Sequence, residues 1–416
     1  MDNGFFNFRF PFSIVHRPSS YMIYIVKTFA GLEDILVAEL IELGATEVVK
    51  LKRGASFEGD LEMLYRANYF LSTGLRILSP IAEFESHNEN QLYTSIKEID
   101  WSPFLKVEQT FAIDAVVYSS FFKHSHYVGL KAKDAIVDQF REKMNRRPSV
   151  DVQSPHVQIH IHVAENKVSV SLDASGESLH KRGYRQSSTE APLNEVLAAG
   201  IVRLSSWDKT KPLVDAMCGS GTILTEAGIN LRKMPPQLRR KHFAFMNWQN
   251  FDAVLWEKVK SEDGKTSDNR RWAMDNGKAK DVNFPSPGVH RLSSDTPIIG
   301  FDWNEKAVRS SQSNIESIGL SNDIRIHKKN FFENEPSYPE GVLIMNPPYD
   351  ERMKLGDDIL FHKQIGDALK KNWKNWQVWI FTGNLEAAKF IGLRPSRKIH
   401  LFNGAIESRL LRFDVY

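Results

Sequence analysis

The stretch Leu213-Val214-Asp215-Ala216-Met217-Cys218-Gly219-Ser220-Gly221-Thr222 decides the fold class of this chain. A short apolar run ends at an acidic residue, and two glycines lie in the turn before a helical pattern. Such a turn between a parallel strand and a helix lets the backbone approach a ligand closely. It lacks the Gly-Lys-Ser/Thr of a phosphate-binding loop, and Leu224 stands where GxGxxG has its third glycine. The turn alone therefore fits both a ligand-binding loop and a plain strand–helix connection.

The segments around this turn alternate between strand and helix. Strands are predicted at 212–216, 297–301, 323–328, 341–345 and 377–382, helices at 192–207, 220–232, 304–318, 357–373 and 385–391, and final strands at 398–402 and 407–415. The alternation predicts an α/β domain of Rossmann-like type, with a parallel, doubly wound sheet that ends in an antiparallel hairpin.

Residues 233–296 interrupt the alternation. Their first half holds an aromatic-rich helical patch that includes Phe243 and Trp256, and their second half is a polar stretch from 261 to 295. We expect a lid-like insertion whose second half is mobile. The aromatic patch is more consistent with an insertion core than with a platform for stacking bases.

The part before residue 176 has a different organisation. Residues 1–21 are expected to be a loose leader, and residues 22–75 follow the order β-α-β-β-α, which predicts a small α+β unit. Residues 76–175 add strands and a long amphipathic helix at 128–144, and the domain from 176 to 416 follows. Strict alternation of apolar residues at 157–163 predicts a half-buried strand.

Composition limits the class of protein. Charged residues make up 25% and apolar residues 42% of the chain, an ordinary globular composition. The single cysteine, Cys218, allows no intramolecular disulfide and favours a cytoplasmic location. No apolar run approaches the ~20 residues of a membrane helix, so we expect no membrane partner.

The net charge of +3 is unevenly distributed. Residues 22–100 carry 7 Lys and Arg against 13 Asp and Glu, residues 101–190 carry 12 against 10, and residues 191–416 carry 33 against 27. The acidic first part is unsuited to a polyanion, and the excess in the later parts is a weak signal for nucleic acid.

A second polar motif is Gly300-Phe301-Asp302-Trp303-Asn304, which places an acid at the end of the next predicted strand. In nucleotide-binding sheets this acid accepts hydrogen bonds from ribose hydroxyls, although a helix N-cap is the plain alternative. Asp302 follows Asp215 by 87 residues, far more than the usual ~20. The insertion accounts for most of the excess.

The third motif is Asn346-Pro347-Pro348-Tyr349, directly after an apolar strand. Two prolines fix the backbone and remove two N–H donors, which leaves carbonyl oxygens free beside the asparagine oxygen and an aromatic face. Such a set of acceptors suits an exocyclic amine on a planar base. The alternative is a Pro-Pro turn that merely leaves the strand.

Together these motifs resemble those of the S-adenosylmethionine-dependent amino methyltransferases, with motif I matched by residues 215–221 and motif IV by residues 346–349. The chain from about 22 to 416 is similar to the THUMP-domain methyltransferases that form N2-methylguanosine in bacterial large-subunit rRNA. The most specific match is Leu179-His180-Lys181-Arg182-Gly183-Tyr184-Arg185, followed by Ala191-Pro192-Leu193-Asn194. Some relatives carry a second methyltransferase domain, and this chain ends at Tyr416 without one.

The resemblance implies a ferredoxin-like unit at 22–75, a THUMP RNA-binding domain at 76–175 and a Rossmann-like methyltransferase domain at 176–416. It implies S-adenosylmethionine as cofactor, large-subunit (23S) rRNA as partner and no metal. The implied cofactor-binding residues are Pro192, Leu193, Asp215, Met217, Gly219, Ser220, Gly221, Asp302, Trp303, Asn330, Phe331 and Asn346. The implied catalytic residues are Asn346, Pro347, Pro348 and Tyr349. Asn346 and the Pro347 carbonyl would accept the two N–H groups of a flipped guanine, and Tyr349 would stack on the base.

Several other residues have two readings. Cys218 lies inside the glycine turn, where a core position is favoured over a covalent nucleophile. His160 and His162 share a strand face without metal-ligand spacing. Five cations on or after the long helix belong either to a solvated face or to an RNA phosphate contact: Lys131, Lys133, Arg141, Arg146 and Arg147.

Two classes of alternative function remain open at this point. The first is an amino methyltransferase for another substrate, such as tRNA guanine, adenine N6 or a protein glutamine amide, because Asn-Pro-Pro-Tyr serves all of them. The second is a non-catalytic RNA-binding assembly factor. The intact polar motifs argue against the second class.

Overall fold

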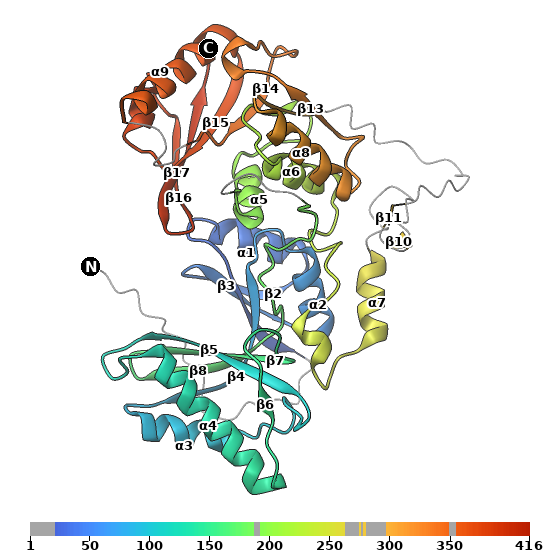
Figure 1. The fold of residues 1–416 in the computed structure, drawn as a ribbon, viewed down its shortest axis with the longest axis vertical. Coiled ribbons are helices and arrows are strands. Elements are labelled where there is room, and N and C mark those ends of the chain that lie inside the picture. Colours follow the sequence, from blue (N-terminus) through green and yellow to red (C-terminus); the bar gives the residue numbers. More distant parts are fainter. Residues whose placement is uncertain (1–20, 187–191, 263–273, 276–277, 280–296, 349–354) are drawn as a thin grey trace.

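The computed structural model describes residues 21–186, 192–262, 274–275, 278–279, 297–348 and 355–416. Three parts follow one another along the long axis of the molecule (Figure 1). The first unit lies in the middle, the second at one end and the third, which contains the glycine turn, at the other. Within these described ranges, none of the helices has the length and apolar character to cross a bilayer.

The first unit has the predicted β-α-β-β-α order. Its elements are β1 (Met22–Lys27), α1 (Glu33–Glu42), β2 (Thr46–Leu51), β3 (Gly54–Gly59) and α2 (Leu61–Phe70). Asp60 begins α2, because its carboxylate accepts a hydrogen bond from the Met63 amide at 2.9 Å. The apolar sides of both helices contribute to one buried cluster with β1 and β3.

The second unit continues the sheet of the first. Its elements are β4 (Arg76–Glu85), α3 (Glu89–Glu98), β5 (Thr110–Tyr118), α4 (Ser125–Met144), β6 (Ser149–Val150), β7 (Val157–Ala164) and β8 (Lys167–Asp173). The eight strands have the order β2-β3-β1-β4-β8-β7-β5-β6. β4 pairs with β1 over residues 76–78 and with β8 over residues 78–85. One strand therefore joins both units.

The third part contains the predicted doubly wound sheet. Its helices are α5 (Glu195–Leu204), α6 (Thr222–Arg232), α8 (Glu305–Ser317) and α9 (Leu355–Asn372), with 3-10 turns η3 (Phe331–Glu333) and η4 (Ala387–Ile391). Its strands are β9 (Leu213–Asp215), β12 (Ile298–Asp302), β13 (Ile324–Lys328), β14 (Gly341–Met345), β15 (Trp376–Thr382), β16 (Arg397–Asn403) and β17 (Ile406–Asp414). The order is β13-β12-β9-β14-β15-β17-β16, and β17 runs antiparallel to β15 and β16. The Rossmann-like fold class is confirmed.

Two details differ from the sequence prediction. The helix expected at 192–207 begins only at Glu195, because the Asn194 side chain accepts the Val196 amide at 2.9 Å and ends the preceding loop. The segment expected to form a helix at 385–391 is only the 3-10 turn η4.

Side chains alternate between two cores along the central strand β14. Val342 and Ile344 pack in the cluster that includes α5 and α6, and Leu343 and Met345 pack in the cluster that includes α9. All of β14 is buried. A strand that is apolar on both faces is typical of a sheet covered on both sides by helices.

The described first half of the insertion packs on the first unit. Its described first half comprises η1 (Ala244–Asn247) and α7 (Ala253–Ser261), and α7 lies beside α2 of the first unit (Figure 1). Tyr65 of α2 stacks on Phe245 with ring centroids 4.5 Å apart and meets Trp256 edge-on at 5.8 Å. The aromatic patch is therefore core, as favoured, but it clamps the first unit instead of covering the site as a lid. The polar second half, apart from β10 (Met274–Asp275) and β11 (Lys278–Ala279), lies outside the described residues.

The first unit is docked tightly on the third part. A Cβ added at Gly200 of α5 would come within 2.6 Å of the Leu32 side chain, so glycine permits the close approach of α1 and α5. The carboxylate of Glu39 is buried between them and accepts hydrogen bonds from the Ser72 and Thr73 amides and from Arg203 at 2.9–3.1 Å. A buried charge with this many donors fixes the mutual orientation of the two parts.

Candidate active site

Three predicted motifs meet at the carboxyl ends of adjacent parallel strands. In the register of the sheet, Asp215 of β9 lies between Gly300 of β12 and Ile344 of β14. Asp302 is the last residue of β12, and Asn346 directly follows the end of β14. The sheet therefore brings Asp215, Asp302 and Asn346 to one edge, the usual ligand position in open α/β sheets.

The glycine turn has the backbone that glycine permits. Gly219 and Gly221 have φ angles of 53° and 77°, in the left-handed region. A Cβ on Gly221 would lie 3.0 Å from Ser311 Oγ of α8. Ser311 Oγ donates to the Gly219 carbonyl at 2.8 Å, and Asn314 Nδ2 donates to the Ser220 carbonyl at 3.0 Å. α8 thus holds the turn in place from behind.

Two carboxyl groups line the turn in different ways. Asp302 Oδ2 accepts the Gly219 amide at 3.0 Å, and its Oδ1 accepts the Asn304 amide at 2.9 Å. Asp215 is fully buried, and this burial, with the nearby Asp302 charge, raises its pKa to about 8. Asp215 has no ion-pair partner in the described part of the chain, and such a buried carboxyl is suited to a ligand that carries a positive group.

Asn346 has an unsatisfied oxygen. Its Oδ1 atom is buried and has no hydrogen-bond partner within the described part of the chain. Buried amide oxygens are nearly always paired, so an unpaired one at a strand end points to a missing donor. Pro347 is buried and Pro348 is exposed beside it, whereas Tyr349 lies outside the described residues.

The other implied cofactor residues surround this edge. Leu193 is buried and Pro192 exposed, Met217 and Ser220 lie in the glycine turn, and the Trp303 ring is 73% exposed. The Asn330 side chain caps η3 by accepting the Phe332 amide at 3.2 Å. The Phe331 ring packs on Trp373, with centroids 5.9 Å apart. Any contact of Phe331 with a ligand would therefore come from its main chain.

The sequence reasoning gave no role to a half-buried polar group beside the turn. Arg185 Nε donates to Glu195 Oε1 at 2.9 Å, and its Nη2 donates to the Leu193 carbonyl at 3.0 Å and to Thr222 Oγ1 at 3.3 Å. Arg185 therefore ties the segment around 193 to the start of α6. The only signal was its place in the motif 179–185.

Arg182 and Tyr184 of the same motif converge on a buried acid. Tyr184 Oη donates to Glu226 Oε1 at 3.1 Å, and Arg182 Nε lies 3.5 Å from the same oxygen. Burial raises the pKa of Glu226 to about 7, against the lowering effect of Arg182. This group connects the first unit to α6, because Arg182 also donates to the Ser72 carbonyl.

A second polar group went unnoticed near the end of β15. Asn384 Nδ2 donates to Asp358 Oδ2 at 2.9 Å. Asp358 Oδ1 and His362 Nε2 of α9 are buried without partners in the described ranges. β15 is the parallel neighbour of β14, so Asn384 follows β15 at the same edge of the sheet at which Asn346 follows β14.

The remaining candidates have more ordinary surroundings. Cys218 is buried, and this burial, with the Asp215 charge, raises the pKa of its thiol well above the usual range, so it is no thiolate nucleophile at neutral pH. His160 Nε2 lies 3.4 Å from Asp114, and burial lowers the pKa of His160 to about 4. It is a neutral core side chain at neutral pH.

The five predicted RNA-binding cations lie on or just after α4, and three of them have acidic partners. Lys133 pairs with Asp134 at 2.6 Å, Arg141 with Asp138 at 3.1 Å and Arg146 with Glu108 at 3.1 Å. Lys131 lies over the Tyr127 ring at 5.6 Å. Arg147 is exposed and has no ion-pair partner in the part of the chain that the structure describes. Their contact with RNA remains a prediction.

Comparison with known families assigns each part. Residues 182–412 match the description "RMKL-like, methyltransferase domain", residues 86–173 match the THUMP domain, and residues 24–78 match the RlmL ferredoxin-like domain.

Similar curated proteins agree with these matches. A protein of Synechocystis sp., provisionally named an RNA methyltransferase, is 36% identical over 97% of this chain and 98% of its own length. The ribosomal RNA large subunit methyltransferases K/L of Syntrophotalea carbinolica and Methylococcus capsulatus are 36% and 33% identical over 94% and 92% of this chain. The chain spans only 54% and 50% of the length of these two proteins.

Solved structures share the architecture. SMU.472, provisionally named a methyltransferase and solved with SAH, has a TM-score of 0.80 and 26% identity over 95% of this chain and 98% of its own. TrmN from Thermus thermophilus, with a TM-score of 0.64 and 16% identity over 95% of this chain and all of its own, shares the fold. The predicted resemblance is confirmed, and with it S-adenosylmethionine as the cofactor of the family. The chain belongs to the RMKL-like methyltransferases that carry a ferredoxin-like and a THUMP domain.

Proposed function

We propose that this chain transfers a methyl group from S-adenosylmethionine to the exocyclic N2 amine of a guanine in large-subunit rRNA. The observation that carries the proposal is the buried, unpartnered Oδ1 of Asn346 at the edge of the sheet that also holds Asp215 and Asp302. An acceptor in this place needs an N–H donor, and an exocyclic amine supplies one.

Relatives support the substrate class. Two of the similar proteins are named large subunit rRNA methyltransferases, and the THUMP match suggests RNA binding. Because this chain spans about half of those relatives, their activity comes to it as a proposal. The cytoplasm, where ribosomes are assembled, is the expected location.

The residues of the glycine turn fit the cofactor. Asp215 would lie near the positive amine of its methionine part, Asp302 would accept ribose hydroxyls, and Trp303 offers an exposed ring to the adenosine part. Gly219 and Gly221 leave the backbone bare for this approach. When bound, the cofactor supplies an electrophilic methyl group on a sulfonium.

The chain's own part in the reaction is orientation. Asn346 Oδ1 and the Pro347 carbonyl would accept the two N–H groups, which directs the nitrogen lone pair toward the methyl group. A guanine amine is a weak nucleophile because its lone pair is delocalised, so this alignment is the main catalytic effect. The amine loses a proton to solvent after it gains the methyl group, and since the methylated nitrogen is acidic, no strong base is required.

The test is methyl transfer to protein-free 23S rRNA with labelled cofactor, followed by nucleoside analysis. The expected product is N2-methylguanosine. Formation of N6-methyladenosine, or transfer to tRNA alone, would show that the proposed substrate is wrong. The assignment as a methyltransferase would stand. Cofactor binding without transfer to any RNA would contradict the proposed reaction and favour an assembly factor.

A further inference from the structure

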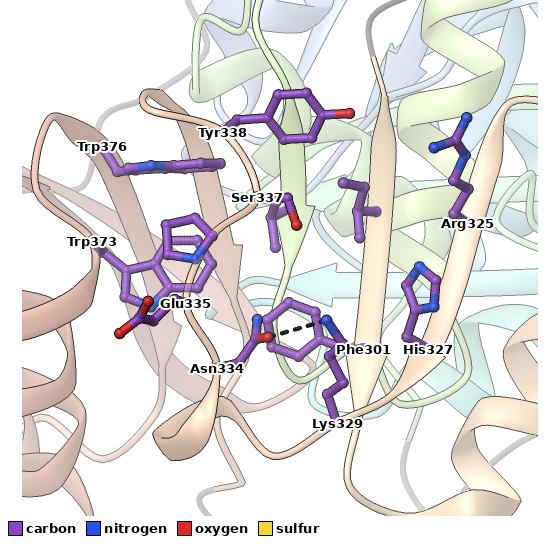
Figure 2. A pocket seen from close by; sticks show the side chains of 13 residues that line it. Phe301, Arg325, His327, Lys329, Asn334, Glu335, Ser337, Tyr338, Trp373 and Trp376 are labelled. Carbon is purple, nitrogen blue, oxygen red and sulfur yellow. Dashed lines mark hydrogen bonds between the residues drawn. The ribbon is translucent and has the colours of Figure 1, made fainter.

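A cavity of about 130 Å³ opens on the α9 face of the sheet (Figure 2). One water molecule needs about 10–15 Å³ of such a cavity, so this volume has room for roughly ten waters. That is about the number of non-hydrogen atoms in a nucleobase. Val214, Ile299 and Phe301 form its floor, and Trp373, Trp376 and Tyr338 form an aromatic wall. None of the predicted cofactor or catalytic residues that the structure describes lines it.

The topology explains why this face is open. The connection from β13 to β14 must cross β12 and β9, because these strands lie between them in the sheet. It has only 12 residues, 329–340, and the single 3-10 turn η3 as regular structure. A doubly wound sheet normally has a helix over such a crossover. Here an extended loop with Asn334, Ser337 and Tyr338 borders the cavity instead (Figure 2).

The edge strand β13 has a different character on its two faces. Ile324 and Ile326 pack toward α6 and Gly300, on the covered face. On the other face Arg325, His327 and then Lys329 line the cavity. Exposed cations are common on edge strands as a protection against aggregation. These cations, however, border an aromatic recess.

The cations of the rim are available for an anion. Neither Arg325 nor Lys329 has a carboxylate partner in the described ranges, and Lys329 Nζ contacts only the Asn334 amide oxygen, at 3.2 Å. By contrast, Lys328 on the opposite face pairs with Glu305 at 3.1 Å. Glu335 is the single acid that lines the cavity.

The wall has unused hydrogen-bond donors. Trp373 and Trp376 are 0% and 1% exposed, and the Nε1 atom of each is buried with no partner among the described residues. A buried indole N–H normally finds an acceptor. Because neither nitrogen is open to the cavity, contact with a ligand on this wall falls to the half-buried Tyr338.

We propose that this cavity binds one unpaired nucleotide of the RNA substrate, with its base against Tyr338 and its phosphate on Arg325 and Lys329. The inference rests on the proposed function, since it names a second contact for the same RNA. Base stacking on aromatic rings with cations on the backbone is the usual mode of single-strand binding. Trp373 of the cavity wall also stacks on Phe331, one of the implied cofactor-binding residues.

The experiment compares the full-length chain with Arg325→Glu/Lys329→Glu, and measures binding of a fluorescent single-stranded RNA 12-mer and methyl transfer to 23S rRNA. The matched control is Lys328→Glu/Arg309→Glu, which reverses two exposed cations that pair with Glu305. The cavity variant should flatten the log–log salt slope by about 0.7, for one phosphate on a single strand, and the control by less. Tyr338→Ala should weaken the 12-mer roughly 5- to 100-fold. A 4-thiouridine in the 12-mer should crosslink to the segment 331–348.

The inference would be overturned if the cavity and control variants have equal affinity and salt slope and no crosslink forms to 331–348. The proposed function would still stand in that case if the unaltered chain transfers methyl groups to the RNA. Conversely, a chain that binds the 12-mer through this cavity but methylates no RNA would refute the proposed function alone. If the cavity variant binds ribosomal particles more weakly but binds naked RNA as well as the unaltered chain does, the cavity contacts a ribosomal protein. This outcome would also overturn the inference.

Discussion

At the scale of single residues, the site is built from groups whose bonding is incomplete. Asp302 is already engaged twice by backbone amides, and it therefore supports the glycine turn besides facing the ligand. Asn346 Oδ1 has no partner among the described residues, and Asp215 accepts one hydrogen bond, from the Met217 amide at 3.3 Å; both groups are buried. Unpaired buried groups lower stability, so their presence together is typical of a binding site.

Asn346→Ala should separate chemistry from binding. The fold and the cofactor affinity should stay near those of the unaltered chain, because the lost oxygen has no partner in the described part of the free protein. Methyl transfer should fall by about 10²–10³, the usual cost of one polar group in a preorganised site. Single-turnover transfer to 23S rRNA measures the effect, with the exposed Asn322→Ala as control. Full activity in Asn346→Ala would refute the role of this residue.

Asp215 should make stability depend on pH. Its pKa of about 8 in the folded chain exceeds the ordinary value near 3.8, so between these two values the folded state holds a proton that the unfolded state has lost. The free energy of unfolding should therefore decrease as pH rises from about 4 to 8. Asp215→Asn should remove this contribution, and its Tm should fall less between pH 6 and pH 9. Identical profiles of Tm against pH in both proteins would contradict the raised pKa of Asp215. Glu226, with a pKa of about 7, changes the Tm of both proteins equally, so it does not affect the comparison.

At the scale of elements, the periodicity of apolar residues predicted most helices and strands. It could not predict which charged side chains pair across long sequence separations. The α4 helix illustrates this. Its cations stand out in the sequence, yet Asp138 and Glu108 neutralise Arg141 and Arg146 in the folded chain. Glu108 lies before β5, 38 residues away along the sequence, so the pair could not be foreseen from local pattern.

If the cations on and after α4 contact phosphates, those with no acidic partner in the described ranges, such as Arg147, should matter most. Arg147→Ala should flatten the salt slope of RNA binding by ~0.7–0.9, because each phosphate contact releases about one counterion. Arg141→Ala should change the slope less, since Asp138 already compensates that charge. Titrations of an rRNA fragment at several salt concentrations measure both. Unchanged salt slopes and affinities in both variants would show that these cations lie on a solvated face and do not contact RNA.

At the scale of the whole molecule, the first two units are one structural body. β4 pairs with β1 on one side and with β8 on the other, so the hydrogen-bond ladder runs through all eight strands. The described part of the insertion reinforces the first unit through Tyr65, Phe245 and Trp256. The domain boundary between residues 75 and 76 is a sequence-based division, and it falls at the start of the shared strand.

Damage to one half of this sheet should therefore loosen the other half. Ile161 in β7 is fully buried, and Ile161→Ala should cost about 2–5 kcal/mol. Hydrogen exchange should then accelerate in β1 and β3 as well as in β7, because they open as one cooperative unit. Ile380→Ala in β15 is the matched control, since this buried residue lies in another core. Faster exchange confined to β5–β8 would show that the two units open separately.

The sequence by itself determined the Rossmann-like class and the positions of the three motifs. Apolar runs and helical periods are local patterns of 5–20 residues, and parallel strands bring their carboxyl ends to one edge whatever the length of the insertion between them. Asp215, Asp302 and Asn346 could therefore be placed together without knowledge of the structure. The tertiary structure alone decided the merger of two units through β4, the clamp of α7 on α2, and the cavity beneath the 329–340 loop. Each depends on surfaces that meet across long separations, as with Arg66 and Glu262, which are 196 residues apart, and no local pattern encodes which surfaces will meet.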